Sequence, residues 1–180
     1  MSWKRLSRRT VYETPWMRVV EDEVVNPSGG QNTYGNIQFL NRAVAIVPLD
    51  ADGNTWLVGK NSNTLGEWSW ELPMGGAPLD EDTSAGAARE IAEETGLTAR
   101  RWTEIMRLHT SNSITDEVGY VYLAEELEAG EPDFGETEDI EILKLGLDEA
   151  LAMIDRGEIT DAISVAALLK VDRLRATSSP

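Results

Sequence analysis

The amino-acid sequence predicts an α/β fold of the α+β type, in which a mixed β-sheet lies between helices as an α/β/α sandwich. Three observations lead to this fold class. Short runs of β-type residues fill the first part of the chain, a helical segment with closely spaced acidic residues follows, and two helical segments lie near the C-terminus. The chain has 180 residues, 41% of them hydrophobic, so it is expected to bury the core of one main domain.

The first part of the chain is expected to consist mainly of strands. Asp52 and Gly53 form a hairpin signal between two of them. Trp68, Trp70 and Leu72 alternate with polar residues, which is typical of a half-buried strand. The other strands predicted in this part are residues 17–25, 34–40, 43–49 and 55–58.

The last part of the chain is expected to complete the sheet and then form two helices. The predicted strands are residues 102–108, 118–124 and 140–145. The first helix is expected to open at Leu147 or Asp148 and to end near Ile154. Asp161 can cap the second helix, and residues 177–180 are expected to form a flexible tail.

The most specific pattern in the chain begins at Gly75. Glu81 follows after five intervening residues, and seven further residues separate Glu81 from an uninterrupted run. That run reads Arg89-Glu90-Ile91-Ala92-Glu93-Glu94-Thr95-Gly96-Leu97.

This run is predicted to be helical. A helix advances by about 100° per residue, so Glu90, Glu93 and Glu94 share one face, on which their three carboxylates are expected to converge. The opposite face is predicted to pack against the sheet through small residues. These are Ala85, Ala88, Ala92 and Thr95.

Three like charges on one helix face require a neutralising partner. Oxygen-rich sites favour hard cations, and Mg²⁺ is usually held by one or two carboxylates together with substrate phosphate oxygens. Arg89 can hold a neighbouring carboxylate in a fixed orientation through its planar guanidinium. Gly96 can end the helix in a left-handed conformation. Gly75 and Gly76 are expected to turn sharply before the helix and to bring a carbonyl close to an ion.

The pattern resembles the signature of the Nudix hydrolases. The resemblance implies Mg²⁺-assisted attack of water on a nucleoside diphosphate linked to another moiety, with Mn²⁺ as a possible substitute. It assigns Glu90 and Glu94 as principal metal ligands, with Glu93 as third ligand or helper. The backbone carbonyl of Met74 is a further candidate ligand, and Glu81 would support the site.

The residues Trp70-Glu71-Leu72-Pro73-Met74-Gly75-Gly76 are similar to the lead-in of the ADP-ribose pyrophosphatase branch of that family. In this branch an acidic loop supplies the general base, which implies Glu136 or Glu138. The candidate catalytic residues are therefore Arg89, Glu93, Glu94 and one of these two glutamates. The candidate substrate-binding residues are Trp16, Arg42, Glu71, Gly75 and Gly76.

The resemblance also predicts the domain organisation. Residues 1–42 would form an N-terminal β extension that takes part in a homodimer interface, and residues 43–176 would form the Nudix domain. Two positions depart from the branch: Lys60-Asn61-Ser62-Asn63 replaces a Gln-x-Arg motif, and Ser111-Asn112-Ser113 replaces a Ser-Pro-Gly motif. The leaving group therefore stays open between ADP-ribose and a nucleotide sugar.

Composition excludes several other classes of protein. A net charge of −16 argues against nucleic-acid binding, and no apolar run is long enough to cross a membrane. The absence of cysteine excludes disulfides and the catalytic thiol of an isopentenyl-diphosphate isomerase. We expect a cytoplasmic enzyme with a small nucleotide substrate. The alternatives are a hydrolase of nucleoside triphosphates or dinucleoside polyphosphates, and a non-catalytic nucleotide-binding module.

Overall fold

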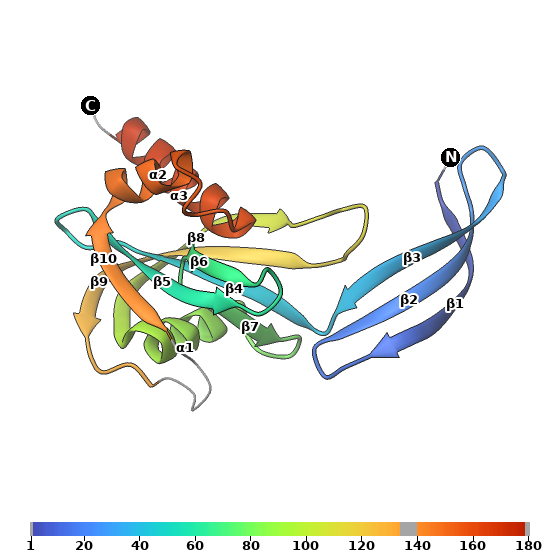
Figure 1. Cartoon of the computed structure of the whole chain (residues 1–180), viewed down its shortest axis with the longest axis horizontal. Coiled ribbons are helices and arrows are strands. Elements are labelled where there is room, and N and C mark those ends of the chain that lie inside the picture. Colours follow the sequence, from blue (N-terminus) through green and yellow to red (C-terminus); the bar gives the residue numbers. More distant parts are fainter. Residues whose placement is uncertain (1, 134–139, 179–180) are drawn as a thin grey trace.

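The computed structural model describes residues 2–133 and 140–178. A three-stranded antiparallel sheet protrudes from one end of the main body (Figure 1). Its strands are β1 (Lys4–Glu13), β2 (Met17–Val25) and β3 (Gln31–Phe39), in the order β1-β2-β3. β2 is the central strand of this sheet, and every residue of β1 is exposed.

The main body contains a mixed sheet in the order β7-β4-β9-β8. Its strands are β4 (Asn41–Pro48), β7 (Met74–Pro78), β8 (Leu97–His109) and β9 (Val118–Ala129). β4 and β9 run parallel, whereas the β4–β7 and β8–β9 pairs are antiparallel. The sheet is mixed, as predicted.

A second antiparallel sheet has the order β10-β5-β6. Its strands are β5 (Asn54–Ser62), β6 (Glu67–Glu71) and β10 (Glu141–Gly146). The turn between β4 and β5 forms at the predicted hairpin signal, where the amides of Asp52 and Asn54 donate to Asp50 Oδ1 at 3.0 and 2.8 Å. Because successive side chains of a strand point to opposite faces of its sheet, each strand contributes side chains to two layers of the molecule.

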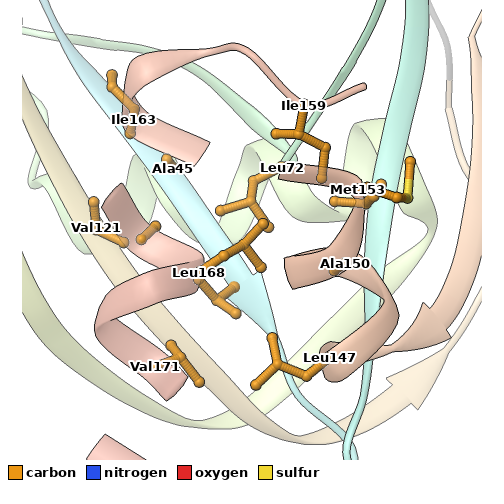
Figure 2. Close-up of a cluster of buried hydrophobic side chains, with 13 residues drawn as sticks. Ala45, Leu72, Val121, Leu147, Ala150, Met153, Ile159, Ile163, Leu168 and Val171 are labelled. Atoms are coloured by element: carbon orange, nitrogen blue, oxygen red, sulfur yellow. The ribbon is translucent and has the colours of Figure 1, made fainter. Parts of the chain in front are cut away.

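Helices cover the sheets from two sides. α1 (Thr83–Thr95) lies on one side, and α2 (Leu147–Asp155) with α3 (Ala162–Ser178) lies on the other (Figure 1). Leu147, Met153 and Leu168 of α2 and α3 pack toward Leu72 and Ala45 in the larger core cluster, as Figure 2 shows. A second cluster forms beneath α1. The predicted α/β/α sandwich is confirmed.

Four expectations about individual elements need correction. β1 lies in the expected N-terminal β extension but outside the individually predicted strands, because its apolar residues are too few and too widely spaced to show an alternation. The segment that begins with Met74 is a strand and not a loop, since Gly75 and Gly76 pair with Val44 and Ala43. α3 continues through Ser178, so the expected tail at residues 177–180 starts inside a helix, and residues 179 and 180 lie outside the described part.

The fourth correction concerns the buried face of α1. Ala85 is exposed, and Ala88 and Ala92 are only half-buried. The helix instead buries Thr83, Gly86, Ala87, Ile91, Glu94 and Thr95. A branched side chain at Ile91 fills the space above the sheet better than a stripe of alanines does, which rotates the helix relative to the prediction.

The loop between β8 and β9 makes non-covalent contacts with β3 and so holds the protruding sheet against the main body. Asp116 Oδ1 accepts the Phe39 amide hydrogen at 2.8 Å, and the Tyr34 hydroxyl donates to the Ser113 carbonyl. Ile37 also forms an isolated parallel bridge with Thr115. None of the helices described here is long and apolar enough to span a membrane.

Candidate active site

Local sequence signals fix both ends of α1. The Asp82 side chain accepts hydrogen bonds from the amides of Ser84 and Ala85, which caps the first turn. Gly96 has a φ of 71°, a left-handed conformation that glycine adopts without strain, and its amide donates to the Ala92 carbonyl. The C-terminal end at Gly96 matches the prediction, whereas the cap at Asp82 was not among the predicted features.

Gly75 provides room for the carboxylate of Glu90. A Cβ atom built on Gly75 would overlap that carboxylate, so any larger residue would displace the Glu90 side chain. Glu90 is largely buried, with 13% of its side chain exposed. This burial raises the pKa of Glu90, and the nearby Arg89 guanidinium opposes the shift.

Arg89 organises the outer part of the acidic face. Its Nη1 contacts Glu90 at 2.7 Å and Glu93 at 3.2 Å. Its Nη2 donates to the Gly76 carbonyl at 3.0 Å and contacts Glu81 at 3.4 Å. Burial lowers the pKa of Arg89, but the hydrogen bond from Arg89 to Glu90 and the other carboxylates outweigh this effect and raise the pKa overall. The predicted orienting contact between Arg89 and a carboxylate is present.

Glu94 lies at the buried edge of the same face. Its Oε2 accepts the Met74 amide hydrogen at 2.9 Å, and only 10% of its side chain is exposed. Burial raises the pKa of Glu94 to about 7, although Lys60 and the Met74 amide lower it. A cation beside such a carboxylate would stabilise its charged form, because the cation compensates for the hydration lost on burial.

Two buried hydrogen bonds position the segment that leads into the site. The Leu72 amide donates to the Ser164 hydroxyl of α3 at 2.9 Å, and the Pro73 carbonyl accepts from the Ile46 amide at 2.9 Å. They tie residue 72 to α3 and residue 73 to β4. The Met74 amide is thereby directed at Glu94.

The three helix carboxylates do not converge as predicted. Arg89 lies against Glu90 and Glu93, Glu94 turns toward Met74, and 46% of the Glu93 side chain is exposed. Among residues 2–133 and 140–178, no three acidic or histidine side chains form a group that could hold a metal ion. Each carboxylate has a positive or N–H partner that offsets the repulsion between like charges: Glu90 and Glu93 share Arg89, and Glu94 accepts from the Met74 amide.

The residues nevertheless fit a divalent cation. Glu90 and Glu94 supply oxygen donors, which hard cations prefer, and both carboxylates are removed from bulk water. The space beside Gly75 is kept free for Glu90, whereas an alanine there would exclude it. The chemistry of the donors and the glycine cradle therefore suit the metal that the sequence pattern implies.

Two predicted substrate-binding residues lie in unexpected surroundings. Arg42 Nη2 donates to the carbonyls of Pro78, Leu79 and Glu81, so it anchors the loop before α1, and its role as a phosphate contact stays a prediction. Trp16 lies in the turn between β1 and β2, where 64% of it is exposed. Its role stays a prediction.

The candidate general bases, Glu136 and Glu138, lie outside the described residues. The chain just before them is anchored to α1, because the Asp133 amide donates to the Glu93 carbonyl at 3.0 Å. The Gly130 amide likewise donates to the Gly96 carbonyl at 2.8 Å. The choice between the two glutamates stays a prediction.

Sequence reasoning missed Lys60, a residue of β5 that reaches the site. Lys60 Nζ contacts Glu71 Oε1 and lies 3.9 Å from Glu94 Oε1. The sequence did contain a signal for this contact. If the predicted strand at residues 55–58 is extended by two residues, alternation places Lys60 on the same face as Val58, which pairs with Glu71.

Comparison with known proteins identifies the class to which this fold and site belong. The NUDIX domain model matches residues 39–168, which is more than half of the chain. The chain therefore belongs to the Nudix family and is a Nudix hydrolase, an enzyme class that generally uses a divalent metal. A second model, the nucleoside diphosphate sugar hydrolase N-terminal domain, matches residues 3–36.

Two curated relatives are similar over nearly the whole chain. An ADP-ribose pyrophosphatase of Mycobacterium tuberculosis is 34% identical over 172 residues, covering 94% of this chain and 83% of the relative. An ADP-ribose pyrophosphatase of Bacillus subtilis is 33% identical over 167 residues, covering 92% and 90%. A crystal structure of an ADP compounds hydrolase has a TM-score of 0.89 at 19% identity and covers 99% of this chain and 97% of that one. It supports the fold.

Proposed function

We propose that this Nudix hydrolase cleaves the diphosphate bond of a nucleoside diphosphate linked to a sugar, with ADP-ribose as the leading substrate and a nucleotide sugar as the second. The products are a nucleoside monophosphate and a phosphorylated second half. We propose Mg²⁺ as the physiological cation, with Mn²⁺ as a substitute.

The observation that carries this proposal is the arrangement of Gly75, Arg89, Glu90 and Glu94. Glu90 fills the space beside Gly75, Arg89 orients it, and the Met74 amide orients Glu94. Oriented, partly desolvated carboxylates of this kind can hold divalent cations beside a diphosphate. Similarity to two ADP-ribose pyrophosphatases supports the choice of substrate.

In this proposal the residues of the chain bind and orient the reactants. Bound divalent cations would polarise the diphosphate and lower the pKa of the attacking water. Glu90 and Glu94 would hold the cations, with Glu93 as third ligand or helper, and Arg89 with Glu81 would keep Glu90 in place. Glu136 or Glu138 accepts the proton of the attacking water.

We further propose that residues 1–42 form part of a homodimer interface and that Trp16 contacts the nucleobase. Trp3, Leu6, Val11, Tyr12 and Trp16 are all large apolar residues with more than half of their surface exposed. An exposed edge strand with apolar side chains favours pairing with another chain. The cytoplasmic location expected from the sequence stays a prediction.

A substrate panel tests the proposed function. Purified enzyme is incubated with Mg²⁺ and ADP-ribose, several nucleotide sugars, dinucleoside polyphosphates or nucleoside triphosphates, and the released monophosphate is measured. The highest kcat/KM is expected for ADP-ribose or a nucleotide sugar. A preference for triphosphates would contradict the substrate, and no hydrolysis of any compound would contradict the proposed reaction.

A further inference from the structure

Lys60 is a cation inside the acidic site that the mechanism above does not use. It lies on β5 opposite Ser69 of β6 and directs its ammonium group toward α1. Its Nζ contacts Glu71 Oε1 and lies 3.9 Å from Glu94 Oε1. The two carboxylates are 13% and 10% exposed, whereas 38% of the Lys60 side chain is exposed.

The contacts of Lys60 with Glu71 and with Glu94 differ in strength. The contact with Glu71 is a close ion pair, but the separation from Glu94 exceeds hydrogen-bond length. Lys60 can therefore lose its interaction with Glu94 at a small cost in free energy while its ion pair with Glu71 is retained. The Arg89 guanidinium, in contrast, is fixed at short distances by Glu81, Glu90, Glu93 and the Gly76 carbonyl together.

The surroundings of Lys60 explain its position when no other cation is near. A buried carboxylate without a positive partner loses the favourable hydration of its charge. Lys60 supplies that charge to both Glu71 and Glu94. An ammonium group on a flexible four-carbon stem can change partners more readily than a planar guanidinium held by several bonds.

We propose that Lys60 exchanges partners during substrate binding. In the free enzyme it neutralises Glu94, and when Glu94 binds a divalent cation it keeps Glu71 and donates to a non-bridging oxygen of the substrate diphosphate. This inference rests on the proposed function and adds a specific phosphate-binding residue to it. Lys60 thereby links occupancy of the metal site to recognition of the diphosphate.

The exchange predicts opposite effects of one substitution on two affinities. Lys60→Gln removes a cation that competes for Glu94, so Mn²⁺ affinity without nucleotide should rise. The expected rise is about two- to fivefold, which corresponds to the loss of one weak ion pair. The same substitution removes a charge-assisted hydrogen bond to phosphate. Affinity for a methylene-bridged, non-hydrolysable ADP-ribose analogue at saturating Mg²⁺ should fall about ten- to a hundredfold.

Calorimetric titration of the full-length enzyme measures both affinities. Lys144→Gln is a matched control, because Lys144 lies in the same sheet on β10 and pairs with Asp50 at 2.9 Å. This control removes the same charge and should change neither affinity. Circular dichroism and thermal unfolding of each variant establish that the fold is retained, and Lys60→Met serves as a second variant with the same two expected changes.

Three results would overturn the exchange. A rise in metal affinity with unchanged analogue affinity would make Lys60 a competitor only, a parallel loss of both affinities would make it structural, and no change would make it a bystander. These results are distinct from failure of the proposed function, which would appear as absence of analogue binding by the unaltered enzyme itself. Opposite changes in the two affinities support the inference.

Discussion

The carboxylate of Glu90 on α1 lies against Gly75 of β7 and fills the space that a Cβ atom on Gly75 would occupy. This contact joins a residue of the sheet to a residue of α1. The backbone of Gly75 has an ordinary strand conformation and pairs with Val44, so its conformation does not require a glycine. The glycine is needed because it has no side chain and lets Glu90 approach closely. The spacing between Gly75 and Glu90 in the sequence therefore has a steric cause.

Substitution of this glycine tests the steric argument. Gly75→Ala should displace Glu90 and lower kcat by about a hundredfold, the typical effect of misplacing a reacting group by about 1 Å. Steady-state kinetics with the preferred substrate measures the change. Gly35→Ala is the control, since Gly35 is also a strand glycine but has nothing within 4 Å of its Cβ position. Equal activity of both variants would refute the role of the contact.

Glu94 should be essential for turnover but not for folding. The amide oxygen of Glu94→Gln can still accept the Met74 amide hydrogen, so the melting temperature should stay close to that of the unaltered enzyme. Loss of the anionic oxygen should lower kcat by about a thousandfold or more. Kinetics and thermal unfolding on the same preparation separate the two effects, and a nearly normal rate would exclude Glu94 as a principal metal ligand.

Arg89 should be sensitive even to a conservative change. Arg89→Lys cannot contact two carboxylates and the Gly76 carbonyl at once, so the orientation of Glu90 is lost. Residues that orient metal ligands typically contribute about ten- to a hundredfold to metal affinity, and a loss of that size is expected in a Mn²⁺ titration. Arg156→Lys is the control, because Arg156 also pairs with two glutamates but lies on the surface near α2. A similar loss in both variants would contradict the prediction.

Asp50 should make stability depend on pH in the acidic range. Burial raises its pKa, but hydrogen bonds from Asn54 and Lys144 outweigh burial and lower the pKa from 3.8 to about 2. A carboxylate whose pKa is lower in the folded state stabilises the fold above about pH 4, and this contribution disappears as the pH falls toward 2.

Urea unfolding followed by tryptophan fluorescence from pH 7 to pH 2 measures this contribution. Asp50→Asn should lower the free energy of unfolding at pH 7, and the difference from the unaltered protein should shrink below pH 4. Asp52→Asn in the same turn is the control and should leave the curve unchanged. A difference that stays constant down to pH 2 would show that the charge of Asp50 is not responsible.

The protruding sheet should control the oligomeric state. Light scattering should give the mass of a dimer for the unaltered protein and of a monomer for Leu6→Lys combined with Val11→Lys, since both side chains are exposed on the edge strand β1. Leu169→Lys on α3 changes an equally exposed leucine elsewhere and should remain dimeric. A monomeric unaltered protein at tens of micromolar would contradict the dimer.

Local patterns predicted the helices well. The cap at Asp161 precedes α3, and Gly96 ends α1 because capping depends on residues that are neighbours in the chain. The alternation at Trp68 and Trp70 predicted a strand where β6 forms, but Ser69 is buried there and Trp68 is exposed, opposite to the expected orientation. Periodicity and capping together gave the order of most elements of the main body.

The errors have non-local causes. β1 is held to β2 partly by ion pairs such as Arg8 with Asp22 and Arg9 with Glu21, which apolar periodicity does not detect. Gly75 and Gly76 are unfavourable in strands, yet Glu90 from another element requires the space above Gly75. The spread of the helix carboxylates also depends on partners from β5 and β7, which the helix sequence alone cannot reveal.

The central claim is that Glu90 and Glu94 bind divalent cations next to the substrate diphosphate. Electron paramagnetic resonance of Mn²⁺ with the methylene-bridged ADP-ribose analogue tests this claim most directly. The unaltered enzyme should take up Mn²⁺ together with the analogue, and the Glu90→Gln, Glu94→Gln double variant should take up almost none while remaining folded. Equal Mn²⁺ uptake by the two proteins, or none by the unaltered enzyme, would contradict the assignment of the site.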